Sequence, residues 1–248
     1  MIHYHGSPIT PDTCAIRALK ARHAFISFAH HNQLGLASEI CQSFALDNGA
    51  FTFWKTGKKV DWSSYYEFIA KWKNHPRFDF AIIPDVIDGG EKENDELIMA
   101  WPHGSCGVPV WHMNESDERF IRLCKTFNRV AIGSCGEYDV SKPRKAVEKL
   151  KDVIRHVVDD NGYPVAKLHG LRMLNKQVFQ HIPISSADST NVARNIGIDK
   201  NWKGAYSPQS KETRAAVLVE RIEAFNSASS LNYNEETDKA IIQMAFEI

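Results

Sequence analysis

The amino-acid sequence predicts an α/β fold: a single (β/α)8 barrel of the TIM type that spans residues 1–248 and carries helices at its C-terminal end. Eight short apolar segments alternate with stretches long enough to form a helix, and strands that alternate with helices build parallel sheets. Several of these segments end on a carboxylate, a histidine or a glycine-rich turn, and the catalytic groups of such barrels lie where strands end. Eight units within 248 residues favour a closed barrel over an open doubly wound sheet, and no domain boundary is visible.

Short runs of apolar residues are expected to form the strands, because a buried parallel strand is apolar on both faces. Parallel strands joined by helices need right-handed crossovers, which a barrel repeats around its axis. In chain order, the expected strands are Ile2–His5, Ala24–Phe28, Phe44–Asp47, Phe78–Pro84, Val108–Met113, Arg129–Ile132, Val165–His169 and His181–Ser185.

Amphipathic segments between and after the strands are expected to form helices. Ser63–Asn74 opens with a serine that can cap a helix and then places apolar residues at helical spacing. Ser116–Phe127 opens with Ser-Asp-Glu and runs its apolar residues along one face. The remaining expected helices are Lys142–Val158, Glu212–Asn226 and Thr237–Phe246, with a loop over 227–238 before the last of them.

The composition is that of a globular protein without a global charge signal. Lys plus Arg and Asp plus Glu both number 30, which excludes a non-specific binder driven by net positive charge but is compatible with a basic face. The five cysteines form no CxxC pair and no Cys/His cluster, so we expect neither a metal site nor a disulfide framework. The chain shows no signal sequence and no apolar run of membrane-spanning length, and we expect a cytoplasmic protein.

Three aspartates follow expected strands and are candidates for chemistry. Asp188 could attack an electrophilic sugar carbon, or it could cap the helix that begins at Ser189 or Thr190. Asp47 lies in LDNGAF, where Asn-Gly forces a tight turn, and it either faces a substrate or only stabilises that turn. Asp85 could accept hydrogen bonds from the edge of a heterocyclic base, or it could stabilise its own loop. Carboxylates after the third, fourth and eighth strands should converge at one rim, and paired acids of this kind cleave glycosidic bonds.

A glycine-rich turn and a histidine complete the candidate pocket. Gly133, Ser134 and Glu137 follow the sixth strand in RVAIGSCGE and could line the pocket. This turn lacks the spacing of a dinucleotide fingerprint, and no cofactor is expected. His112 is either a polar group of the pocket or a satisfied core histidine, and Trp111 beside it must face the opposite way on a strand.

Two clusters of basic and aromatic residues follow catalytic strands and therefore belong on the rim. Such clusters could form a groove for nucleic acid, because bases stack on aromatic rings and phosphates attract cations. The alternative is that both clusters are solvated loop charge. The first cluster is Trp54, Lys55, Lys58 and Lys59, and the second is Arg194, Lys200, Trp202 and Lys203.

From about Phe44 to Thr190, the chain resembles the catalytic barrel of the tRNA-guanine transglycosylase superfamily, including the branch that acts on DNA. LDNGAF is similar to the family's Asp-Ser-Gly-Gly-Phe segment, which implies a proton-handling role for Asp47. RVAIGSCGE is similar to its Ala-Ile-Gly-Gly-Leu turn and the following Gly-Glu, which matches Gly133 and Glu137 to pocket positions.

The resemblance also implies roles for two further aspartates, and it has departures. Asp85 falls where the family reads the edge of the base, and Asp188 falls where it has its covalent nucleophile. His112 stands where the family carries a glutamine that reads guanine, and an imidazole cannot offer the same donor and acceptor as a carboxamide. Ser134 replaces the second glycine of the Gly-Gly pair. The zinc-binding insertion that helps the family to hold tRNA has no counterpart, which disfavours tRNA as the substrate.

Together these features predict an enzyme that cleaves an N-glycosidic bond in nucleic acid, with DNA favoured over tRNA and no membrane partner. A flipped nucleotide would enter the rim pocket, where Asp188 attacks C1′ and Asp47 activates water, and the result is base excision that leaves an abasic site. The expected target is a modified base, in defence against foreign DNA. If a free base arrives in place of water, the outcome is exchange of guanine for a 7-deazaguanine. A non-catalytic barrel that binds nucleic acid and a barrel hydrolase for a small sugar are the alternatives of other classes.

Overall fold

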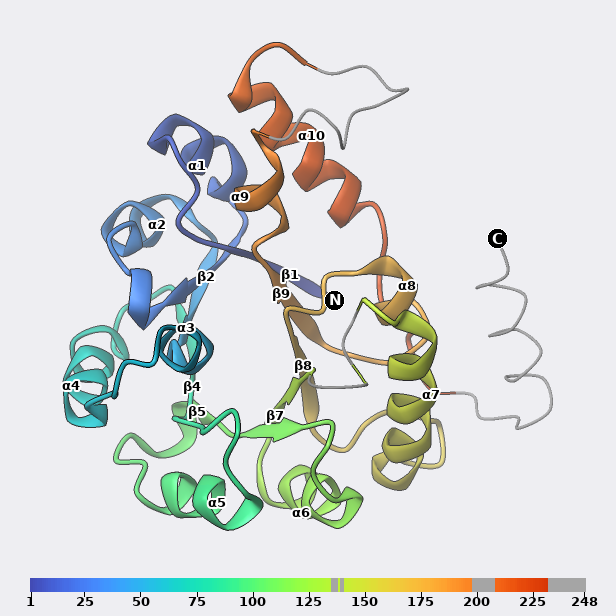
Figure 1. Ribbon diagram of the computed structural model, residues 1–248. Helices are drawn as coiled ribbons and strands as arrows, with labels where there is room; N and C mark the ends of the chain where they lie inside the picture. The colour runs from blue at the N-terminus through green and yellow to red at the C-terminus, as the bar shows by residue number, and fades with distance from the viewer. Residues whose placement is uncertain (135–137, 139–140, 198–207, 232–248) are drawn as a thin grey trace.

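The computed structural model describes residues 1–134, 138, 141–197 and 208–231, which form a barrel of parallel strands surrounded by helices (Figure 1). Within these residues, nine short strands belong to one sheet, and every adjacent pair is parallel. Their order is β5-β4-β3-β2-β1-β9-β8-β7-β6. The strands are β1 (Ile2–Gly6), β2 (His23–Ser27), β3 (Ser43–Asp47), β4 (Phe78–Ile82), β5 (Gly107–Val108), β6 (Val110–His112), β7 (Arg129–Gly133), β8 (Lys167–Leu171) and β9 (Ser186–Ser189).

The short strands β5 and β6 occupy one barrel position that is interrupted by Pro109, which has no N–H to donate to a neighbouring strand. On one side, Ile83 N donates to Val108 O at 2.9 Å, and on the other side Ala131 N donates to Pro109 O at 2.9 Å. The segment 107–112 therefore bridges β4 and β7 and closes the ring at eight positions. The (β/α)8 barrel expected from the sequence is confirmed.

Helices surround the barrel and cover the outer faces of its strands (Figure 1). Helix α3 differs from the others because it follows β3 directly and lies over the end of the barrel that faces the viewer in Figure 1. The helices of the described residues are α1 (Asp12–Leu19), α2 (Leu34–Ile40), α3 (Ala50–Thr56), α4 (Trp62–Trp72), α5 (Glu91–Met99), α6 (Asp117–Thr126), α7 (Pro143–Ile154), α8 (Lys176–Phe179), α9 (Asn191–Asn195) and α10 (Lys211–Glu223).

Inward-facing side chains fill the centre of the barrel, as the alternation of side chains along each strand requires. Tyr4, Phe25 and Phe80 belong to this interior cluster, and the rings of Tyr4 and Phe80 meet edge-on with centroids 5.7 Å apart. Outward-facing side chains pack against the helices in two larger clusters. Because the centre is packed, the barrel is not a pore, and a ligand site must lie at one of its ends.

The last strand lies later in the chain than the sequence predicts, at Ser186–Ser189 rather than His181–Ser185. The apolar residues Ile182 and Ile184 are buried in the outer cluster, in the turn that precedes the strand. The strand itself is built from small residues, because Tyr4 of the neighbouring β1 fills the interior beside it. The prediction for this strand is therefore wrong, since it assigned an apolar run that packs against helices.

Helices start close to the predicted positions. Ser116 caps α6, and its Oγ accepts a hydrogen bond from Arg119 N at 3.2 Å. Helix α4 starts at Trp62, and its capping residue is Asp61 rather than the predicted Ser63. Of the other predicted elements, 142–158 corresponds to α7, 212–226 to α10 and 165–169 to β8, which is shifted by two residues, while 237–246 lies outside the described residues.

Candidate active site

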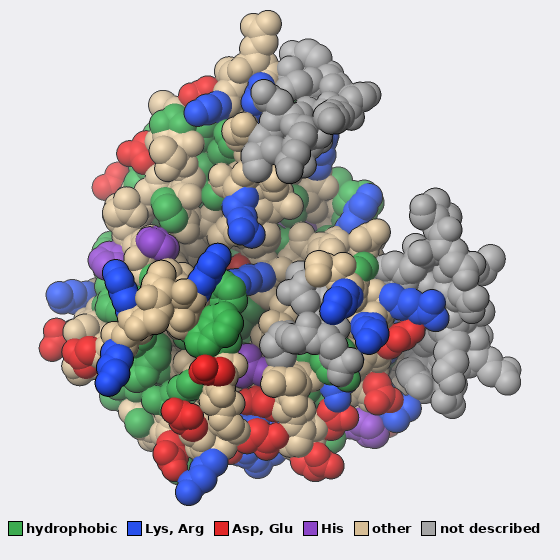
Figure 2. Space-filling view, in the orientation of Figure 1, with side chains coloured by type: hydrophobic (Ala, Val, Ile, Leu, Met, Phe, Trp, Pro, Cys, Tyr) green, Lys and Arg blue, Asp and Glu red, His purple; other side chains and the backbone are tan. Residues whose placement is uncertain are grey.

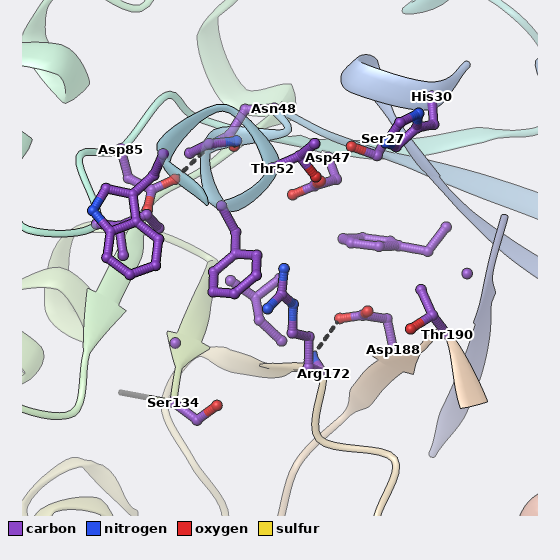
Figure 3. Close-up of a pocket in the computed structure, with 18 of the residues that line it drawn as sticks. Ser27, His30, Asp47, Asn48, Thr52, Asp85, Ser134, Arg172, Asp188 and Thr190 are labelled. Carbon is purple, nitrogen blue, oxygen red and sulfur yellow. Dashed lines mark hydrogen bonds between the residues drawn. The ribbon is translucent and has the colours of Figure 1, made fainter. Parts of the chain in front are cut away.

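A cavity of about 320 Å³ opens at the C-terminal ends of the strands, and all eight barrel positions contribute to its lining. In the space-filling view of Figure 2, hydrophobic and Lys or Arg side chains lie together near the centre of this face, and Asp and Glu side chains gather over α5 and α6. The close-up in Figure 3 shows the side chains that converge on the cavity. Its polar lining includes Ser27, His30, Asp47, Asn48, Thr52, Asp85, His112, Ser134, Arg172, Asp188 and Thr190.

Asp188 lies within β9, in register with Tyr4 of β1, and its carboxylate faces the cavity (Figure 3). The residue is 4% exposed, and its Oδ1 atom accepts a hydrogen bond of 2.8 Å from the backbone N–H of Arg172. The following turn uses a different side chain, because Ser189 Oγ accepts the hydrogen bond from Asn191 N at 2.9 Å. The interpretation of Asp188 as a helix cap is therefore wrong.

Asp47 combines a local role with a place in the cavity wall. Its Oδ2 accepts from Gly49 N at 3.1 Å, which is the turn expected from Asp-Asn-Gly, and Gly49 has a φ of 78° that favours glycine. Burial, followed by the negative charge of Asp188, raises the pKa of Asp47 to about 6. The Ser27 hydroxyl and the Arg172 guanidinium oppose this rise. Asp47 can therefore gain and lose a proton near neutral pH.

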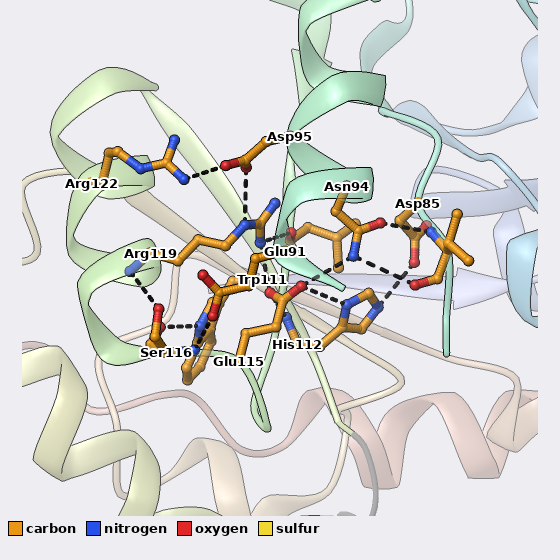
Figure 4. Close-up of polar contacts among 12 residues, drawn as sticks. Asp85, Glu91, Asn94, Asp95, Trp111, His112, Glu115, Ser116, Arg119 and Arg122 are labelled. Atoms are coloured by element: carbon orange, nitrogen blue, oxygen red, sulfur yellow. Dashed lines mark hydrogen bonds and ion pairs between the residues drawn. The ribbon is translucent and has the colours of Figure 1, made fainter. Parts of the chain in front are cut away.

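Asp85 and His112 form a buried ion pair in the cavity wall (Figure 4). His112 Nε2 lies 3.0 Å from Asp85 Oδ2, and Asp85 Oδ1 accepts from Asn48 Nδ2 at 2.7 Å. On its other side, His112 Nδ1 lies 3.4 Å from Glu115 Oε1. Burial disfavours the charged imidazole, but hydrogen bonds and attraction to the two carboxylates overcome it and raise the pKa of His112 to about 9. At neutral pH this histidine is an imidazolium between two carboxylates.

Glu115 links this ion pair to a chain of alternating charges that reaches the surface (Figure 4). Its Oε2 accepts from Arg119 Nη1 at 2.6 Å, and Arg119 Nε lies 3.0 Å from Asp95. Asp95 also pairs with the exposed Arg122 at 2.5 Å. Because each buried charge meets an opposite one, the network can exist inside the protein without uncompensated charge. Both nitrogens of His112 are engaged in it, so the histidine orients Asp85 and has no free nitrogen with which to read a base.

The ring of His112 occupies space that a side chain on the neighbouring strand would otherwise fill. Gly133 faces His112 in the register between β6 and β7, and a Cβ atom on Gly133 would lie 2.9 Å from His112 Cδ2. Trp111 is fully buried in the outer cluster against Phe120, with ring centroids 4.6 Å apart. Trp111 and His112 thus face opposite sides of their strand, as predicted.

Arg172 and Phe51 line the mouth of the cavity, and neither is among the residues that the sequence predicts. The Arg172 guanidinium lies over the Phe51 ring, 3.4 Å from its centroid. Phe51 also contacts the ring of Trp54, with centroids 5.7 Å apart, and Trp54 is 50% exposed. Arg172 has a φ of 56°, which is a left-handed backbone conformation. This conformation accompanies the hydrogen bond from Arg172 N to Asp188, a tertiary contact that no sequence pattern indicates.

The other predicted residues are divided between the rim and the part of the chain that is not described. Ser134 lines the cavity. Lys55, Lys58 and Lys59 are exposed at the end of α3 and directly after it, beyond the cavity mouth. Arg194 is exposed on α9. Glu137, Lys200, Trp202 and Lys203 lie outside the described residues.

Because the comparisons with known proteins give no match, any conclusion about function must rest on the cavity. No protein-family model matches the sequence, and no curated protein is significantly similar to it. Within residues 1–134, 138, 141–197 and 208–231, no group of three or more His, Cys, Asp or Glu side chains is arranged to hold a metal ion. In the same residues, no helix combines the length and apolar character that crossing a membrane requires.

Proposed function

We propose that the protein cleaves the N-glycosidic bond of a modified base in DNA and leaves an abasic site. The observation that supports this proposal is that Asp188 and Asp47 face one cavity, where burial and the charge of Asp188 raise the pKa of Asp47. Two acids in one pocket, one of them with a raised pKa, can divide the roles of nucleophile and proton carrier. The resemblance of the sequence to the tRNA-guanine transglycosylase superfamily favours the same division of roles.

Asp188 is the proposed nucleophile. Its Oδ1 atom accepts the Arg172 N–H, and Oδ2 is left to attack C1′ of a flipped nucleotide. The bond that forms joins Oδ2 to C1′, the bond that breaks joins C1′ to the base nitrogen, and the electron pair leaves with the base. A cavity of about 320 Å³ is at the small end of ligand sites, which suits one flipped nucleoside.

Asp47 is the proposed proton carrier. Because its pKa is about 6, part of the enzyme holds the neutral acid near neutral pH, and this acid can protonate the departing base. The resulting carboxylate then takes a proton from a water molecule. The water oxygen bonds to C1′ while the bond from C1′ to Asp188 Oδ2 breaks. This second step returns Asp47 to the acid and Asp188 to the carboxylate.

The walls and mouth of the cavity offer groups that suit a nucleotide. Asn48 and His112 fix the Asp85 carboxylate at the cavity wall, and its remaining lone pairs can accept hydrogen bonds from the donor edge of a base. Phe51 and Trp54 present exposed rings at the mouth, where a base can stack. The lysines that follow Trp54 can meet phosphates. A hydrolase for a small neutral sugar would not need the cations.

The proposal is tested by incubating the protein with DNA that contains modified bases and with unmodified DNA of the same sequence. Released bases are measured by mass spectrometry, and abasic sites by strand cleavage in alkali. We expect base release without any added base, and we expect the rate of base release to fall at least roughly a hundredfold in Asp188→Asn. The matched control is Asp152→Asn, an exposed position on α7 away from the cavity, which should keep full activity.

Base exchange is the second candidate function, because the Asp47 carboxylate could take a proton from an incoming base as well as from water. The same assay separates the two, since exchange requires an added free base and incorporates it into the DNA. Undiminished base release by Asp188→Asn would contradict both candidates. DNA binding by the wild type without any release or exchange of bases would favour a barrel that binds nucleic acid without catalysis.

A further inference from the structure

His169 of β8 is fully buried inside the barrel, next to the proposed nucleophile but outside the cavity lining. Its ring lies among the interior aromatic side chains, with ring centroids 5.3 Å from Phe25 and 5.1 Å from Phe80. A histidine in such a centre costs free energy unless its nitrogens meet polar partners. Its position therefore needs a reason other than apolar packing.

The two ring nitrogens of His169 face two side chains of the adjacent strand β9. Nδ1 lies 2.9 Å from Ser186 Oγ, and Nε2 lies 3.5 Å from Asp188 Oδ1. His169 and Ser186 are directly opposite in the register of β8 and β9. Nε2 is buried and completes no hydrogen bond with a described residue. The polar group that it faces is the carboxylate to which the proposed function assigns the attack on C1′.

The Asp188 carboxylate favours one tautomer of His169, because the Ser186 hydroxyl can either donate to Nδ1 or accept from it. If only Nδ1 carried it, the lone pair of Nε2 would point at the Asp188 carboxylate from 3.5 Å, which is repulsive. If the Ser186 hydroxyl donates to Nδ1, the hydrogen lies on Nε2 and points toward Asp188. The second arrangement is favourable for all three side chains.

We propose that His169 is a positioning residue for Asp188: the Arg172 N–H holds Oδ1 by a hydrogen bond, and the His169 Nε2–H attracts the same oxygen from 3.5 Å, so that Oδ2 is the oxygen that bonds to C1′. This inference rests on the proposed function for its chemistry. His169 acts through Asp188 and does not touch the substrate, because it lies inside the barrel behind the cavity wall.

The two donors affect the two chemical steps differently. When Oδ2 bonds to C1′, negative charge leaves the carboxylate, and Oδ1 becomes the carbonyl oxygen of an ester. When water attacks C1′, the Oδ2–C1′ bond breaks, its electron pair returns to Asp188, and negative charge develops beside both donors. Donors aimed at developing charge accelerate the step in which it develops. His169 should therefore matter more for the release of Asp188 from the sugar than for the departure of the base.

The experiment compares His169→Phe, His169→Gln and Ser186→Ala with the wild type in single turnovers on DNA with modified bases. Phenylalanine keeps a ring among the interior aromatic side chains but removes the donor, whereas glutamine can return an N–H to the place of Nε2. We expect His169→Phe to release base at a rate near that of the wild type and to accumulate the glycosyl adduct, which should decay about tenfold more slowly. His169→Gln should restore the decay, and Ser186→Ala should slow it less than His169→Phe.

Two outcomes of this comparison would overturn the inference: adduct decay in His169→Phe that matches the wild type, or base release that slows as much as decay. A second measurement needs no variant and no turnover, namely the nitrogen-15 chemical shifts of the His169 ring in the full protein. They should show hydrogen on Nε2, and hydrogen on Nδ1 alone would contradict the inference. If the chemical shifts place hydrogen on Nε2 but the wild type forms no adduct, the proposed function is rejected while the contact with Asp188 stands. The two failures are therefore distinguishable.

Discussion

His112 Nε2 lies 3.0 Å from Asp85 Oδ2, and this contact places a buried ion pair in the wall of the cavity. The resemblance implies that His112 reads the base, but its second nitrogen faces Glu115 at 3.4 Å, so both nitrogens are committed to carboxylates. Asp85 is consequently a fixed acceptor at the cavity wall, oriented from one side by His112 and from the other by Asn48. The integrity of this wall depends on the charge of His112.

The free energy of unfolding should therefore fall in mildly alkaline solution. The pKa of His112 is about 9 in the folded protein against an ordinary value of 6.5, so the folded state binds the proton more tightly. The stabilisation is fully present below pH 6.5 and is lost as the pH rises through about 9, by an amount on the order of 3 kcal/mol. Urea unfolding at neutral pH and at about pH 10 measures it. His112→Gln is the control, and an equal loss in both proteins would contradict the assignment.

Gly133→Ala should disrupt the same ion pair without a change of charge. The added Cβ atom would lie 2.9 Å from His112 Cδ2, so the ring must shift and its contacts with Asp85 and Glu115 must change. We expect a loss of roughly 1–3 kcal/mol in the free energy of unfolding, together with a lower pKa of His112 measured by NMR. Gly35→Ala is the matched control, because nothing lies within 4 Å of a Cβ atom on Gly35 in helix α2. Equal stability of the two variants would show that the ring adjusts at no cost.

The convergence of Asp47, Asp85 and Asp188 could be predicted from the sequence, because each stands near the end of an apolar segment and the ends of parallel strands meet at one rim. The prediction for the last strand failed for a physical reason. Its apolar signal, Ile182 and Ile184, belongs to the outer core, while the true strand consists of small residues. Over five residues, the periodicity of apolar positions cannot distinguish a turn that packs into the outer core from a strand of the barrel.

The partners of these aspartates could not be predicted, because they depend on contacts between strands. His112 meets Asp85 across 27 positions of sequence, and only the closed ring brings β6 beside the end of β4. Arg172 reaches the cavity through a left-handed backbone conformation that a non-glycine residue rarely adopts. His169 reads in the sequence as one more strand residue, and its relation to Asp188 appears only when β8 and β9 are paired.

The two chemical steps should depend on pH in opposite directions through Asp47. With a pKa raised to about 6, chiefly by burial, Asp47 is the acid needed for base departure below pH 6 and the base needed for attack by water above it. In single turnovers, base release should fall up to about tenfold per pH unit above 6. Decay of the adduct should rise with pH through an inflection below 6, because esterified Asp188 no longer contributes the negative charge that helps to raise the pKa of Asp47. Adduct should therefore accumulate most in mildly acidic solution. Asp47→Asn should remove both inflections, and profiles that stay flat between about pH 5 and pH 8 would reject this role.

Arg172→Gly should separate the two contributions of Arg172, because glycine keeps the backbone N–H that Asp188 accepts and adopts the φ of 56° without strain. Only the guanidinium is lost. Since that group lowers the pKa of Asp47, the inflection for base release should move upward from about 6, while Asp188 still forms the adduct. If the guanidinium also contacts a phosphate, the slope of the logarithm of the DNA-binding constant against the logarithm of the salt concentration should become shallower by about one. This slope is measured with Asp188→Asn as the inactive background. Ala21→Gly, at the other described non-glycine residue with positive φ, controls for relief of backbone strain. An unchanged inflection in Arg172→Gly would mean that the guanidinium does not act on Asp47.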